Sequence, residues 1–238
     1  MLSFLSYVCF VLTALSFASG EAKLMGEKLE ARYRGAQTLQ TTFLERYFEN
    51  GHVARSEAGI AYFRRPGKMR WEYDSPEKNL FVVDGKTAWF YVPEDHTVTK
   101  VPAKQSTDWR TPLALLAGEM KLSRICARIE PATAEKPSVA GDVVLYCPLR
   151  GEHNKPPSAT GEAPEMQDDG PEQSVYLEVA PATGELARIL VRERGGIEIE
   201  FKFADWRFNP SIPVSFFRFD VPRGVAIVDG ESPDESRP

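Results

Sequence analysis

The chain has 238 residues, a length typical of one domain of ordinary size or of two small ones. Hydrophobic residues make up 42% and charged residues 26%, which excludes a polytopic membrane protein and a mostly disordered chain. The net charge of -5 argues against a nucleic-acid-binding surface, because phosphate binding needs a basic stripe. Three cysteines and three histidines are too few for a zinc cluster, so we expect no metal and no cofactor.

Residues 1–20 contain no Lys, Arg, Asp or Glu and are mostly apolar. Small residues at Ala18 and Gly20 fit a signal-peptidase site before Glu21. The apolar run is shorter than a typical membrane-spanning helix of about 20 residues. This favours a signal peptide over a retained anchor or a buried first helix, and predicts a soluble mature protein in an extracytoplasmic space.

Removal of the signal segment takes away Cys9 and leaves an even pair of cysteines, Cys126 and Cys147. They fall in two predicted strands, Leu122–Glu130 and Asp142–Cys147, which a loop rich in Pro, Ala and Gly joins into a hairpin. Because an oxidising compartment favours disulfides, we expect the two cysteines to be bonded. Two buried thiols are the alternative.

The first half of the mature chain predicts one helix followed by short strands. Glu21–Ala36 has apolar residues at roughly helical spacing, after which the period changes to two. Asp84-Gly85 is a strong hairpin signal, since Gly supplies the positive φ of such a turn. The predicted strands are Thr38–Glu49, a strand from His52, Lys68–Asp74, Leu80–Val83, Thr87–Val92 and His96–Val101.

The second half repeats this pattern after a helix at Thr111–Met120, where Thr111 is a suitable cap. Gly151–Glu172 has too few apolar residues for burial to offset the entropy lost on ordering, so we expect a flexible insertion. The tail 231–238 is expected to be disordered. The predicted strands are Ser174–Val179, Leu186–Arg194, Ile197–Phe208 and Phe216–Asp220. Together the elements predict a mainly β (α+β) single domain over residues 21–230, as an antiparallel barrel or strongly curved sheet.

No set of residues points to catalysis, and we expect a protein that is not an enzyme. Gly85-Lys86-Thr87 resembles the end of a phosphate-binding loop, but Leu80 stands where that loop needs a glycine. No Ser or Cys lies in a nucleophile-elbow sequence. Neighbouring carboxylates such as Glu72 and Asp74 fall on the polar face of their strand.

Several strands are apolar on both faces, which indicates either an ordinary core or a barrel-like sheet with a lidded cavity. In such a cavity the acyl chains of a ligand would replace core side chains, at about 0.8 kcal/mol for each buried methylene. The candidate ligand-binding residues are Phe43, Phe63, Met69, Trp71, Tyr73, Val82 and Trp89.

Arg65 ends the strand that begins at His52. If Ala61 and Phe63 face the interior, the period of two sends Arg65 inward as well. An inward arginine at the rim of a sheet is usually paired or hydrogen-bonded. It either anchors a loop or latches a helical lid.

The sequence resembles the periplasmic outer-membrane lipoprotein carrier family, LolA, from about Glu21 to Gly230. The sequence has an Arg-Pro followed by an aromatic strand, and then Asp-Gly-Lys-Thr with further aromatics. In combination, these features are specific to the family. The segments that carry the resemblance are Phe43–Glu45, Gly59–Trp71, Leu80–Tyr91, Thr111–Leu116 and Phe217–Val225.

The resemblance implies an unclosed antiparallel β-barrel with a helical lid. The family's latching arginine falls on Arg65, and its aromatic cavity strand on Met69 and Trp71. We therefore expect a monomeric periplasmic chaperone that takes lipoprotein acyl chains from an inner-membrane ABC transporter and passes them to an outer-membrane receptor. A regulatory sensor barrel for lipid or lipoprotein stress is the alternative, although such regulators usually carry a second domain. The acidic insertion and the cysteine pair depart from the family pattern.

Overall fold

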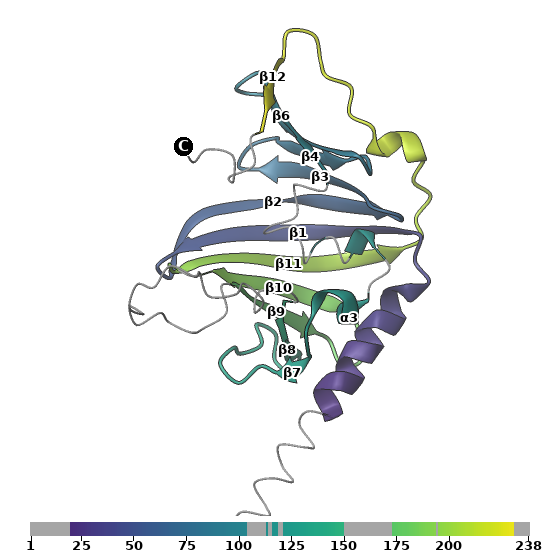
Figure 1. Ribbon diagram of the computed structural model, residues 1–238, viewed down its shortest axis with the longest axis vertical. Helices are drawn as coiled ribbons and strands as arrows, with labels where there is room; N and C mark the ends of the chain where they lie inside the picture. The colour runs from purple at the N-terminus through teal and green to yellow at the C-terminus, as the bar shows by residue number, and fades with distance from the viewer. Residues whose placement is uncertain are drawn as a thin grey trace, which may run out of the picture.

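Twelve strands pair into one sheet in the order β12-β6-β5-β4-β3-β2-β1-β11-β10-β9-β8-β7 (Figure 1). The computed structural model describes residues 20–103, 113, 116–118, 121–149, 173–193 and 195–230. The order begins at β12 and ends at β7, so the sheet is open. The pairs are antiparallel except for β12, which lies parallel to β6. The predicted fold class, mainly β with an unclosed antiparallel sheet, is confirmed.

Long strands form the middle of the sheet and short ones its edges, as Figure 1 shows. The strands are β1 Thr38–Glu49, β2 His52–Arg64, β3 Lys68–Ser75, β4 Leu80–Val83, β5 Thr87–Val92, β6 Thr97–Pro102, β7 Glu130–Pro131, β8 Val143–Pro148, β9 Gln173–Val179, β10 Leu186–Glu193, β11 Ile197–Phe208 and β12 Ala226–Asp229.

Helical segments cover the face of the sheet on which the hydrophobic core lies. An N-terminal helix over residues 20–34 buries Leu29 and Tyr33 completely. Leu113 and Leu116, which are also helical, join the same core cluster. Of the helix predicted at Thr111–Met120, the described residues 113, 116 and 117 are helical, and most of the others lie outside the described part.

A strap, residues 209–225, runs from β11 to β12 (Figure 1), and its aromatic residues pack on the opposite face of the first-half strands. The strap contains the short 3-10 helix η1, Val214–Phe217, and Phe217 is buried. Phe216 packs edge-on against Tyr62 at 4.9 Å, and the Arg64 guanidinium donates to the Ile212 carbonyl at 3.0 Å. The strap explains why these strands are apolar on both faces.

Two predicted strands are wrong. Leu122–Glu130 instead holds the short helix α3, Leu122–Ile125, and only the first residue of β7. Glu30 of the N-terminal helix accepts a hydrogen bond from the Leu122 N–H at 2.7 Å, so a tertiary contact favours the helical start. Phe216–Asp220 contains the end of η1, and the last strand is β12.

The expected Cys126–Cys147 disulfide is present, with the two Cα atoms 5.1 Å apart. Cys126 is not in a long hairpin strand as predicted, but follows α3 and forms an isolated bridge with Leu149. The bond therefore ties α3 to β8. Almost all of the predicted signal segment, the insertion 151–172 and the tail 231–238 lie outside the described residues. No helix in the described part of the chain is both long enough and apolar enough to cross a membrane.

Candidate ligand-binding face

Five of the seven candidate residues lie together on the core face of β1, β2 and β3, which we call the aromatic face. The ring of Trp71 is its centre and lies 4.6 Å from Phe43 and 5.8 Å from Phe63. The ring of Tyr73 is 5.1 Å from Phe43. The five residues, all less than 10% exposed, are Phe43, Phe63, Met69, Trp71 and Tyr73.

Val82 and Trp89 lie on the other face of the sheet and do not line the aromatic face. In the register of β3, β4 and β5, Arg70 is opposite Val82, and Val82 is opposite Trp89. The Trp89 ring packs 5.7 Å from Phe219 of the strap. Hydrophobicity alone does not distinguish the faces here, because the strap buries apolar residues on the second one.

The aromatic face contains polar groups that sequence reasoning missed. Glu45 is 5% exposed, and the Tyr73 hydroxyl donates to its carboxylate at 2.9 Å. The position of Glu45 two residues after Phe43 could have indicated that it lies on this face, since residues i and i+2 of a strand share a face. Among the described residues, the buried Trp71 indole N–H finds no hydrogen-bond partner. The face is therefore apolar with a few defined polar points.

Arg65 bonds to the end of the N-terminal helix. Its guanidinium donates to the Tyr33 carbonyl at 2.8 Å and to the Arg34 carbonyl at 3.3 Å. The last carbonyls of a helix have no partner within the helix and attract a cation. Two residues further on, the Gly67 N–H donates to the Ala117 carbonyl at 2.9 Å. One turn thus holds both helical segments against the sheet.

Tyr33 fixes the N-terminal helix to the second half of the sheet, a role the sequence did not reveal. Its hydroxyl accepts a hydrogen bond from the Leu186 N–H at 3.1 Å, and its ring lies 5.2 Å from Trp206. Burial raises the pKa of this hydroxyl well above its ordinary value, so it stays protonated. The helix therefore packs mainly beside β10 and β11, while Arg65 holds its end.

Nothing in this arrangement resembles a catalytic or metal centre. Within the described residues, no group of three or more His, Cys, Asp or Glu is placed to hold a metal ion. What the geometry offers is a broad apolar surface with a cover attached by main-chain hydrogen bonds.

Comparison with known proteins gives this geometry a context. Residues 34–136 match the family model described as outer membrane lipoprotein carrier protein LolA. An outer-membrane lipoprotein carrier protein of Xanthomonas campestris is 27% identical over 219 residues, covering 92% of this chain and 94% of the relative. The carrier of Chromobacterium violaceum is 28% identical over 227 residues, covering 93% and 97%.

The chain is thus similar to the LolA family model over residues 34–136 and to outer-membrane lipoprotein carrier proteins over more than nine tenths of its length. The part that matches the LolA model contains Arg65 and the whole aromatic face. A solved structure of an uncharacterized conserved protein from Thermus thermophilus aligns with a TM-score of 0.50 at 13% identity, covering 88% of this chain and 99% of that one. This second likeness concerns the fold alone. LolA proteins form a family of carriers rather than of enzymes.

Proposed function

We propose that this protein is a LolA-type periplasmic chaperone that binds lipoprotein acyl chains against the aromatic face and transfers lipoproteins from the inner to the outer membrane. The observation that carries the proposal is the aromatic face itself, together with a cover that Arg65 holds through main-chain carbonyls. Similarity to outer-membrane lipoprotein carrier proteins supports the proposed cargo.

In the closed structure, the protein's own side chains fill the space over the aromatic face, and Trp71 is 1% exposed. Binding therefore requires the helical segments to move away from the sheet. A 16-carbon acyl chain offers on the order of 10 kcal/mol of apolar burial, which replaces the contacts that the cover gives up. Because one set of apolar contacts is exchanged for another, the empty and loaded states differ little in free energy, and both loading and release can occur.

The partners follow from the same proposal. Residues 1–20 act as a signal peptide that delivers the chain to the periplasm. An inner-membrane ABC transporter supplies the lipoprotein, and an outer-membrane receptor takes it. The protein works as a monomer without a cofactor.

The test is Arg65→Leu, with Arg64→Leu as the matched control. The two arginines are adjacent and both donate to a backbone carbonyl, but Arg65 holds the helix and Arg64 holds the strap. Hydrogen bonds from charged donors contribute about 1.5–3 kcal/mol each, so loss of the latch disfavours the closed, empty state by about tenfold or more. We expect Arg65→Leu to fold normally and take up lipoprotein, but to release it to acceptor membranes about tenfold more slowly.

Transfer of a labelled lipoprotein between inner- and outer-membrane vesicles measures this rate, and circular dichroism checks folding. Arg64→Leu should transfer at the wild-type rate. Wild-type transfer by a folded Arg65→Leu protein, or an equal defect in both variants, would contradict the proposed latch.

A further inference from the structure

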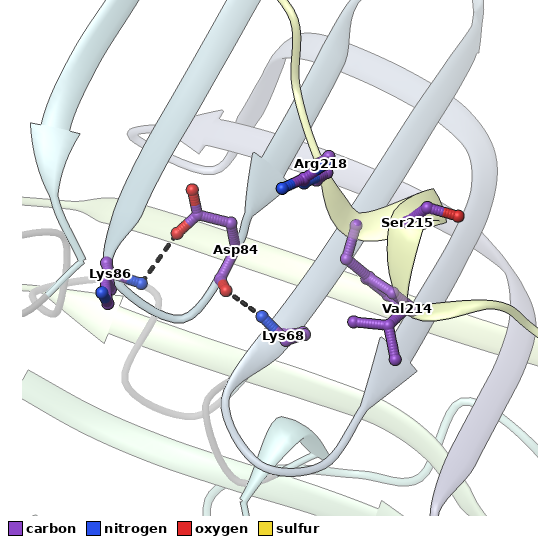
Figure 2. A pocket seen from close by; sticks show the side chains of 7 residues that line it. Lys68, Asp84, Lys86, Val214, Ser215 and Arg218 are labelled. Atoms are coloured by element: carbon purple, nitrogen blue, oxygen red, sulfur yellow. Dashed lines mark hydrogen bonds between the residues drawn. The ribbon is translucent and has the colours of Figure 1, made fainter.

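A surface pocket lies between the strap and the sheet, on the side away from the aromatic face (Figure 2). Its volume is ≈ 450 Å³. Three parts of the chain meet there: the first residue of β3, the β4–β5 turn, and η1 with the residue after it. The lining residues are Lys68, Asp84, Lys86, Val214, Ser215, Phe217 and Arg218.

Positive charge dominates this pocket. Asp84 is the one acidic residue among the described residues that line it, and that carboxylate accepts hydrogen bonds from the Lys86 N–H at 2.8 Å and the Thr87 N–H at 2.9 Å. Partial burial alone would raise the pKa of Asp84, but the Thr87 and Lys86 N–H donors, together with other nearby groups including the Lys68 charge, outweigh it and lower the pKa, so the group is ionised. The carboxylate holds the turn, and the three cations still exceed it by two charges.

The three cations line the pocket and can still donate hydrogen bonds. Lys68 donates to the main-chain carbonyl of Asp84, which uses one of its three N–H groups (Figure 2). In the described part of the chain, Lys86 and Arg218 form no salt bridge. Gathering like charges costs free energy, and a bound anion would offset that cost. Such a cluster of cations is unusual in a chain with a net charge of -5.

Apolar surface accompanies the charge. Phe217 is buried at the pocket wall, and Val214 is 52% exposed beside it. A bare phosphate ion would leave most of the volume empty and these apolar groups unused. An extended acidic peptide has no open strand to pair with, because β3, β4 and β5 are each paired on both sides.

We propose that this pocket binds the phosphate of an anionic phospholipid headgroup, with Lys68, Lys86 and Arg218 as its ligands and Val214 against the glycerol or first methylenes. Such a site would place the strap side of the protein on a membrane surface. It lies on the opposite face from the aromatic face, so it is tested without any lipoprotein, and its failure leaves the carrier proposal intact.

The experiment is co-sedimentation of the full-length mature protein with vesicles of phosphatidylglycerol and phosphatidylcholine, or of phosphatidylcholine alone. The test variant is Lys86→Gln/Arg218→Gln, which leaves the Asp84 hydrogen bonds in place. The control, Lys23→Gln/Lys78→Gln, removes the same charge from exposed positions away from the pocket. Each basic group near an anionic surface adds substantially to binding, so we expect the test variant to bind anionic vesicles about tenfold more weakly or worse.

The control should bind like the wild type, and no protein should bind phosphatidylcholine alone. Equal losses in both double variants would show a diffuse electrostatic effect and overturn the site. Two further experiments measure the binding of inorganic phosphate by ³¹P NMR and the binding of a polyglutamate peptide by calorimetry. Pocket-dependent binding of either one, without binding to anionic vesicles, would assign the pocket to a free anion or a protein partner and overturn the headgroup proposal. Urea unfolding of the test variant confirms that it is folded.

Discussion

Glu178 is a fully buried carboxylate on the outer face of β9. It accepts hydrogen bonds from the Ser138 N–H at 2.8 Å, the Val139 N–H at 2.9 Å and the Arg188 guanidinium at 2.6 Å. Arg188 also contacts Glu135 at 2.8 Å. The residues before β8 are thus fixed to the sheet by one side chain, in the way that the Arg65 turn fixes the helices on the other face.

We expect Glu178→Gln to lower the free energy of unfolding by about 1–3 kcal/mol, because it sets an amide N–H₂ against groups that are already donors. The retained contact of Arg188 with Glu135 limits the loss. Urea unfolding at pH 7 measures it. The control is Glu130→Gln, which breaks an exposed pair with Arg128 and should cost less than about 1 kcal/mol. Equal effects of the two substitutions would contradict the assigned role of Glu178.

The same residue predicts a pH dependence. Burial raises the pKa of Glu178, but the Ser138 and Val139 N–H donors and Arg188 outweigh it, so the folded pKa lies below the ordinary value of 4.5. A lowered folded pKa stabilises the protein above the unfolded pKa, and this contribution is lost as the pH falls through the folded value. The stability gap between wild type and Glu178→Gln should therefore shrink below about pH 4.5. A stability gap that stays constant down to pH 3 would count against a lowered pKa of Glu178 in the folded state.

At the scale of elements, the disulfide joins α3 to β8 across a separation of 21 residues. In the chain-entropy model, a loop of this size stabilises the folded state by about 3 kcal/mol. We expect Cys126→Ser/Cys147→Ser to lose about that amount in urea unfolding, and reductant to lower the wild-type midpoint but not that of the variant. An unchanged midpoint in the double variant would show that the bond is not stabilising.

The elements that the sequence predicted well are those with one clear period. β3 alternates Met69, Trp71 and Tyr73 with charged residues, and the β4–β5 hairpin has Asp84-Gly85 at its turn. Prediction failed where tertiary contacts decide the outcome. The segment at Leu122 is apolar enough for a strand, and its helical start depends on Glu30 from another element.

For the candidate site, too, prediction succeeded where the period was clear and failed where tertiary contacts decide the outcome. The period of two placed Met69, Trp71 and Tyr73 on one face and sent Phe63 and Arg65 inward. The sequence did not separate Val82 and Trp89, which lie on the other face, from this group, because the strap that covers their face comes from the far end of the chain. The contact between Tyr73 and Glu45 was equally out of reach, since it joins two strands through side chains alone.

At the scale of the whole molecule, the two faces of the sheet differ in how they are covered. The strap is the chain between β11 and β12, and it packs its own aromatic rings on the outer face. On the core face, the ends of two helical segments are held through main-chain carbonyls at the Arg65–Gly67 turn. The core face is therefore the one suited to exchange its cover for acyl chains.

The most direct test of this account is native mass spectrometry of the protein recovered from a periplasm that also produces a lipoprotein. The account predicts a complex with the acylated lipoprotein, and none with a form whose lipid-bearing cysteine is replaced. Equal binding of both forms, or recovery of the protein with no lipoprotein bound, would contradict it.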